Sequence, residues 1–280
     1  MDPIRLSATK FGKLASPDFC QFCFWVYLQI DQKAPFDSFP GIFSSIDRYT
    51  KAMIHAYMDK HHKLPACLEG FEDAVGYLEV GRLKHFDEES GILITGEPDD
   101  VFTLTDECLA LADYKTARYP KALAGGDKSE SSMLLPSYGV QLNVYDYLLE
   151  KNDFPKCQKA SLIYFDPTTA LSAPEFLDRW DDLGFSLGFQ AKVLPVELNH
   201  KEILPPLFAR VRKVYELEKA PRGRAGCKNC ERIENMLALA GKGIKLEDAR
   251  YFSDLIGMHG EFGLTERAAV RDAFVTLIGW

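Results

Sequence analysis

Three features are missing from this chain, and each absence excludes a class of protein. No run of apolar residues approaches the roughly 18 that a membrane-spanning helix needs, so we expect no membrane segment. The first residues, Met1-Asp2-Pro3-Ile4-Arg5, lack the basic and then apolar pattern of a signal peptide. The sequence also contains no internal repeat. These absences predict a globular protein of the cytoplasm.

An excess of positive charge is missing as well. The net charge is −8, which argues against a protein that coats nucleic acid through its overall charge. Basic residues nevertheless gather in one segment, 203–232: Arg210, Arg212, Lys213, Lys219, Arg222, Arg224, Lys228 and Arg232. This cluster has two interpretations, an anion-binding surface or an ordinary solvated helix face.

The length of 280 residues allows one large domain or one domain with appendages, and 46% apolar residues is typical of a globular protein. Periodicity and turn residues predict helices near 7–28, 44–62, 138–151, 203–219, 245–257 and 265–278, and strands near 91–95, 99–105, 108–116, 160–165 and 191–198. We expect a mixed central β-sheet flanked by helices. Residues 71–200 would form its core, 1–70 and 201–280 would be helical, and the whole would be one compact unit.

Two acidic residues and a lysine occupy neighbouring predicted strands. Asp113 and Lys115 are two positions apart, so they share one face of the apolar segment 109–115. If the preceding segment, 95–105, pairs with it as a hairpin, Asp99 reaches the same place. Two carboxylates can hold a divalent cation, and an adjacent lysine can orient a water or stabilise negative charge. An exposed ion pair is the alternative, but the apolar setting predicts burial.

Three motifs in this order resemble the PD-(D/E)XK nuclease superfamily. They are Gly96-Glu97-Pro98-Asp99, Asp113-Tyr114-Lys115-Thr116 and Gln141-Leu142-Asn143-Val144-Tyr145. More narrowly, they resemble the RecB-like branch, which includes the CRISPR-associated iron–sulfur nucleases. The resemblance implies a restriction-endonuclease-like core in which Asp99 and Asp113 bind Mg²⁺ or Mn²⁺ and Lys115 is catalytic. Gln141 and Tyr145, which share a helix face, would support the site or touch DNA.

Two assignments of metal ligands have alternatives in the sequence. Asp100 competes with Asp99, but strand alternation places Asp100 on the side of Phe102 and Leu104, which favours Asp99. Members of the RecB-like branch carry an upstream histidine that joins the metal shell, and the resemblance assigns this role to His85. The alternative for His85 is an ordinary surface position.

Two CxxC pairs, Cys20 with Cys23 and Cys227 with Cys230, lie about 200 residues apart. In a cytosolic protein such pairs indicate a metal site rather than disulfides. The ligands suit a 4Fe–4S cluster or a structural Zn²⁺. The resemblance favours the cluster, although related nucleases usually supply one N-terminal and three C-terminal cysteines, whereas this chain has two and two.

The resemblance implies a metal-dependent DNA nuclease, an exonuclease acting on single-stranded DNA or DNA ends. We assign DNA contacts to Arg118, Lys121, Arg222 and Arg224, and expect possible protein partners in a repair or CRISPR complex. Two alternatives stay open. One is an inactive nuclease fold that serves as a DNA-binding or assembly module, and the other is a redox protein built on the cysteines.

Overall fold

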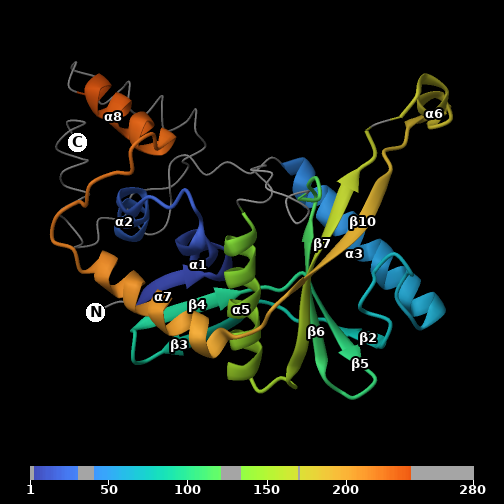
Figure 1. Cartoon of the computed structure of the whole chain (residues 1–280), viewed down its shortest axis with the longest axis horizontal. Helices are drawn as coiled ribbons and strands as arrows, with labels where there is room; N and C mark the ends of the chain where they lie inside the picture. The colour runs from blue at the N-terminus through green and yellow to red at the C-terminus, as the bar shows by residue number, and fades with distance from the viewer. Residues whose placement is uncertain (1–2, 31–40, 121–133, 170, 241–280) are drawn as a thin grey trace. The chain divides into compact units, whose positions relative to one another are not determined.

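The structure, a computed structural model, describes residues 3–30, 41–120, 134–169 and 171–240 (Figure 1). Backbone contacts divide the chain into two units. The first comprises Met1–Pro17 with Phe39–Phe208, and the second comprises Asp18–Ser38 with Ala209–Trp280. The first CxxC segment therefore belongs with the C-terminal part of the chain. The helices predicted at 245–257 and 265–278 lie outside the described residues.

A mixed five-stranded sheet forms the centre of the first unit, in the order β10-β7-β6-β5-β2. Its strands are β2 (Ala74–Leu78), β5 (Asp100–Leu104), β6 (Leu109–Lys115), β7 (Cys157–Pro167) and β10 (Phe189–Val196). β6 pairs with β7 in parallel, and the other pairs are antiparallel. The predicted hairpin is confirmed, because β5 pairs with β6 and brings Asp100 opposite Ala112.

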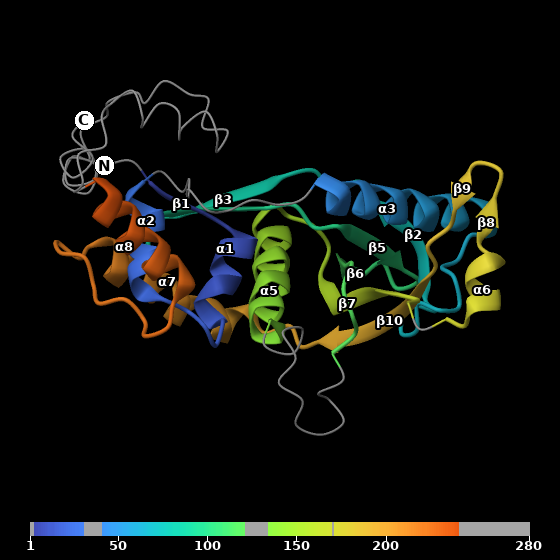
Figure 2. The same cartoon turned by 90° about the horizontal axis from the view of Figure 1, so that it is seen from above.

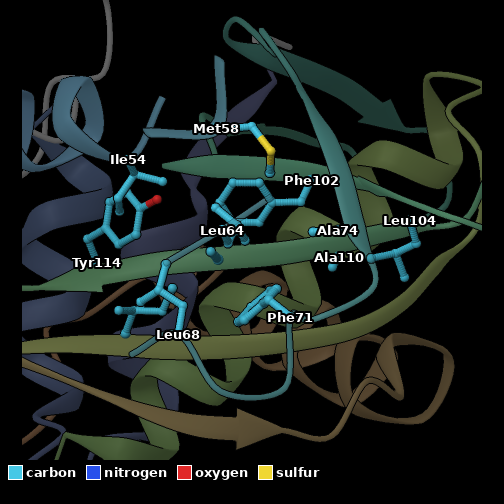
Figure 3. Packing of buried hydrophobic residues seen from close by; sticks show 12 residues of the cluster. Ile54, Met58, Leu64, Leu68, Phe71, Ala74, Phe102, Leu104, Ala110 and Tyr114 are labelled. Carbon is cyan, nitrogen blue, oxygen red and sulfur yellow. The ribbon is translucent and has the colours of Figure 1, made fainter. Parts of the chain in front are cut away.

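β6 is the middle strand, and its sequence reflects that place. Six of its seven residues are buried, as expected for a strand covered on both faces. Helix α3 (Gly41–His61) lies along one face, where Ile54 and Met58 pack against Phe102 (Figure 3). Alanines of β6 and Tyr114 join this cluster. Asp113 and Lys115 therefore alternate onto the other face of the sheet.

That other face is covered by α5 (Leu135–Lys151), which contacts β6 and β7. α5 also contacts β3 (Leu83–Asp87) and β4 (Ile92–Gly96), strands of a second sheet (Figure 2). Ten of the 17 residues of α5 are buried, which a helix packed between two sheets requires. The predicted α/β architecture, a mixed sheet flanked by helices, is confirmed.

The second sheet, in the order β1-β4-β3, was not predicted. Its parallel partner for β4 is β1 (Ile4–Ser7), a strand that precedes the expected helix and overlaps it only at Ser7. Ser7 ends β1 and caps α1 (Ala8–Gly12), and its hydroxyl accepts from the Lys10 N–H at 3.4 Å. The predicted single helix over 7–28 is wrong. A 3-10 turn (Lys13–Ala15) ends the first segment, and α2 (Gln21–Gln29) starts anew.

Two further parts complete the described chain. Between β7 and β10 lie α6 (Ala173–Leu177) and a small hairpin of β8 (Trp180–Asp181) and β9 (Gly184–Phe185), beyond the ends of the long strands (Figure 1). Helices α7 (His200–Tyr215) and α8 (Lys228–Ala240) follow. No helix in the described part of the chain is long and apolar enough to cross a membrane.

Candidate active site and four-cysteine site

Asp113 and Lys115 meet on the face of β6 that α5 covers. Asp113 is 1% exposed, and its Oδ2 forms an ion pair with the Lys115 ammonium. The same ammonium lies 4.0 Å from the centroid of the Tyr138 ring. Burial alone would lower the pKa of Lys115, but the attraction of Asp113 outweighs it and raises the pKa. Lys115 is therefore a fixed positive charge beside a buried carboxylate.

Asp99 joins this pair from the residue just before β5. Its Oδ2 accepts a hydrogen bond from the Tyr114 N–H at 2.8 Å. Burial, and next the negative charge of Asp113, raise the pKa of Asp99 to about 7. Burial also raises the pKa of Asp113, although Lys115 opposes the change. One lysine thus compensates two desolvated carboxylates incompletely, and a divalent cation would complete the balance.

Gln141 and Tyr145 hold Asp113 from α5. The Gln141 Nε2 donates to Asp113 Oδ1 at 3.1 Å and to the Tyr145 hydroxyl at 2.8 Å. The Tyr145 ring lies so close to β4 that a Cβ at Gly96 would come within 2.9 Å of it. Because Gly96 has no side chain, Tyr145 can pack closely against β4. The Tyr145 hydroxyl then holds the Gln141 amide, which orients Asp113.

Asp100 points to the opposite side of β5, as strand alternation predicted. Its carboxylate accepts from the Tyr114 hydroxyl and lies 2.7 Å from His55 Nε2. Lys51 Nζ lies 3.7 Å from the same carboxylate and donates to the Asp99 carbonyl oxygen at 2.5 Å. Asp100 is thus engaged by α3 and β6, which leaves Asp99 as the better placed ligand.

Asp47, on α3, is a candidate that sequence reasoning missed. It accepts from the Thr116 hydroxyl at 3.1 Å, and its charge raises the pKa values of both Asp99 and Asp113. A cleft of about 240 Å³ is lined by Asp47, Arg48, Lys51, Glu97, Pro98, Asp99 and Tyr114. Asp47 and Asp99 therefore line one opening in the surface, the first from α3 and the second from the residue before β5.

A spacing signal for Asp47 was present in the sequence. Polar residues recur every fourth position along α3 at Asp47, Lys51, His55 and Asp59, so they form one stripe. Lys51 and His55 contact the Asp100 region, and Asp59 accepts from the Tyr77 hydroxyl at 3.2 Å. A charged stripe beside the apolar positions of a packed helix marks a polar contact with its sheet.

A sequence model of the PD-(D/E)XK nuclease superfamily matches residues 27–234. The chain belongs to this superfamily. Among solved structures, "Crystal structure of SSO0001" is similar to this chain at 15% identity and a TM-score of 0.38, covering 81% of this chain and 82% of that one. No curated protein matches. Superfamily membership indicates a metal-dependent nuclease that binds nucleic acid, and it agrees with the mixed sheet between helices.

In this PD-(D/E)XK chain, His85 is not among the residues gathered at the carboxylates. It lies on β3, opposite Ile94 of β4. Its ring packs edge-on against the Tyr147 ring, with 5.6 Å between the two ring centroids. Tyr147 in turn donates to Asp87 Oδ1 at 3.3 Å. The role of His85 as a metal ligand stays a prediction, and Asp47 competes with it for the place of a third ligand.

The four predicted DNA contacts are scattered over the PD-(D/E)XK chain. Arg118 and Arg222 are exposed, in the first and second units respectively. Arg224 donates through its Nε to the Asp18 carbonyl oxygen at 3.0 Å, so part of its side chain is engaged within the second unit. Lys121 lies outside the described residues. All four contacts stay predictions.

The four predicted cysteines come together in the second unit. Their Sγ atoms all lie within 4.8 Å of one another, and they form the one such group of His, Cys, Asp and Glu in the described part of the chain. Both pairs stand at helix N-termini, since Cys20 is the N-cap of α2 and Cys227 immediately precedes α8. Two positive helix ends thus face the sulfur atoms, which favours thiolates.

Local donors reinforce the thiolate at Cys20. Its Sγ accepts from the Arg224 N–H at 3.3 Å. Burial acts to raise the pKa of Cys20, but this bond and one from the backbone at Cys23 outweigh it and lower the pKa to about 7. Burial raises the pKa of Cys230 to about 12. Four close thiols cannot all ionise without a cation, so the donor set fits a metal.

Proposed function

We propose that this chain is a metal-dependent deoxyribonuclease that hydrolyses single-stranded DNA or acts at DNA ends as an exonuclease. The observation that carries the proposal is the approach of Asp99, Asp113 and Lys115 beside an open cleft. Carboxylate oxygens are the ligands that Mg²⁺ and Mn²⁺ prefer, and both carboxylates carry charge that burial leaves poorly compensated.

In the proposed site, Asp99 and Asp113 would hold Mg²⁺ or Mn²⁺, with Asp47 as a further ligand. A bound cation would supply polarisation of the scissile phosphate and a lowered pKa of a water. The chain's own residues do the rest. Lys115 orients the attacking water or stabilises the negative charge that develops on the phosphate. Gln141, fixed by Tyr145, holds Asp113 in its orientation.

The lining of the cleft supports a nucleic-acid substrate. Arg48 and Lys51 in this lining would attract a phosphate backbone. Within that class we favour single strands and DNA ends, which the resemblance to the RecB-like branch implies. The RecB-like branch, protein partners in a repair or CRISPR complex, and a place in the cytoplasm stay predictions.

Cleavage of matched substrates tests the proposal. Purified protein is incubated with linear single-stranded DNA, circular single-stranded DNA, blunt duplex and RNA of the same sequence, with Mg²⁺, with Mn²⁺, or with EDTA. We expect degradation of linear single strands with either cation and none with EDTA. Resistance of the circle would establish dependence on ends. Intact linear DNA under every metal condition would refute the proposal.

A further inference from the structure

The four-cysteine site has the size of a single metal ion. Cys20 Sγ lies 3.5 Å from Cys230 Sγ, and Cys23 Sγ lies 3.6 Å from the Sγ atoms of both Cys227 and Cys230. A tetrahedral Zn²⁺ with Zn–S bonds of about 2.3 Å requires sulfur atoms about 3.8 Å apart. The observed separations lie close to that value, so one ion placed among the four sulfurs reaches all of them.

A 4Fe–4S cluster needs a wider arrangement. Each cysteine binds a different iron, and the irons occupy alternate corners of a cube. The four thiolates must therefore surround the whole cube, instead of meeting at one atom. Sulfurs that all lie within 4.8 Å of one another leave no space for four irons and four sulfides. The cluster that the resemblance implied does not fit these residues.

The backbone around the sulfurs opposes a wider site. A Cβ on Gly223 would lie 2.8 Å from Cys230 Sγ, so the chain already touches this sulfur. The next residue donates its N–H to Cys20 Sγ at 3.3 Å. The same short segment, 223–224, therefore contacts one sulfur from each CxxC pair. The four sulfurs can separate only if this segment moves as well.

We propose that Cys20, Cys23, Cys227 and Cys230 hold one tetrahedral Zn²⁺ in place of an iron–sulfur cluster. All four positions are filled by protein sulfur, which is the arrangement of a structural site rather than a catalytic one. The ion joins the N-terminus of α2 to the N-terminus of α8 and closes the second unit. This inference stands independently of the proposed nuclease activity, because none of its residues belongs to the carboxylate site.

Metal analysis of the full-length protein decides between the two centres. The protein is produced in medium supplied with both iron and zinc, is purified without oxygen, and is assayed for metals and acid-labile sulfide. We expect about one Zn²⁺ per chain, a colourless solution and no sulfide. A brown protein with about four irons and sulfide would overturn the inference. One iron without sulfide, or no metal at all, would also overturn it.

Variants assign the ion to these residues. Cys227→Ser should lose the zinc, whereas Cys67→Ser, at an exposed and isolated cysteine, should keep it. Because Cys227→Ser can fail to fold, Co²⁺ is also exchanged into the unaltered protein. We expect the intense visible absorption and thiolate charge-transfer bands of tetrahedral Co²⁺ with four sulfurs. Weak octahedral bands, or zinc retained by Cys227→Ser, would contradict the assignment.

Gly223 supplies a finer test of the close packing. Gly223→Ala adds a carbon 2.8 Å from Cys230 Sγ, whereas Gly81→Ala adds one in open space. Zinc release to a chromogenic chelator should accelerate at least several-fold in the first variant and stay unchanged in the second. Equal release rates in the two variants would contradict the packing on which the inference depends.

Discussion

Asp99 immediately precedes strand β5 and Asp113 lies within strand β6, whereas Cys20 and Cys227 stand at the starts of helices. Both sites gather anionic ligands, but only the cysteines face helix N-termini, whose partial positive charge stabilises anions. The carboxylates have one lysine among them, and burial raises their pKa values. Burial raises the pKa of Cys230 as well, so a bound cation would stabilise the anionic form of the ligands in both sites.

The two sites also differ in access. A cleft opens beside Asp99 and Asp47. The Sγ atoms of the four cysteines lie within 4.8 Å of one another, and they would fill all four ligand positions of a tetrahedral ion. An open position is what a catalytic metal needs, and a closed shell is typical of a structural one. The difference in access therefore agrees with the two proposed roles, a catalytic metal at the carboxylates and a structural metal at the cysteines.

Removing the lysine should have the largest effect on cleavage. Lys115→Ala deletes the positive charge beside Asp113, and we expect cleavage to fall by at least about 10²–10³-fold because transition-state charge loses its stabilisation. Initial rates at saturating DNA and Mg²⁺ measure it. Lys159→Ala is the matched control, since Lys159 lies on the neighbouring strand β7 and pairs with Asp73. Cleavage at the wild-type rate by Lys115→Ala would remove Lys115 from the mechanism.

Breaking the cysteine site should affect stability instead of chemistry. Structural zinc contributes on the order of 10 kcal/mol to small zinc-dependent folds, so Cys230→Ser should abolish amide protection in α2 and α8. Hydrogen exchange should show β5, β6 and β7 still protected. DNA affinity at fixed salt should fall if the 209–232 segment contacts the backbone, and the residual cleavage should stay Mg²⁺-dependent. Loss of protection throughout both units would show that the two sites are not separable.

The third carboxylate should have an intermediate effect. Asp47→Asn keeps the shape of the side chain and removes its charge beside Asp99 and Asp113, so we expect metal affinity or activity to fall about 10–100-fold. Asp59→Asn, on the same stripe of α3 but bonded to Tyr77, is the control. Titration of Mn²⁺ against cleavage rate measures both. Equal metal dependence in the two variants would exclude Asp47 as a ligand.

The smallest effect is expected at His85. Because its ring packs against Tyr147, His85→Ala should change the metal requirement less than Asp47→Asn does. The same Mn²⁺ titration compares the two variants directly. A larger loss of metal affinity in His85→Ala would reverse the order and restore the histidine as the additional ligand.

Local periodicity explains which predictions were correct. Asp113 and Lys115 share a face because strand side chains alternate, and Gln141 and Tyr145 share one because a helix turns every 3.6 residues. Asp100 faces away from Asp99 for the same reason. None of these relations depends on where distant segments fold, so the amino-acid sequence by itself determined them. It also determined the superfamily motifs and the spacing of the two cysteines within each CxxC.

Tertiary structure alone decided the rest, because contacts between distant segments depend on packing. Asp47 lines the same cleft as Asp99 only because α3 lies along the sheet, although the two residues are 52 positions apart in the chain. β1 forms a strand because it pairs with the edge of β4. This pairing between distant segments outweighs the helical pattern of the residues beside it. The separations among the four sulfurs likewise come from the packing of α2 and α8, and the proposal of a single ion depends on them.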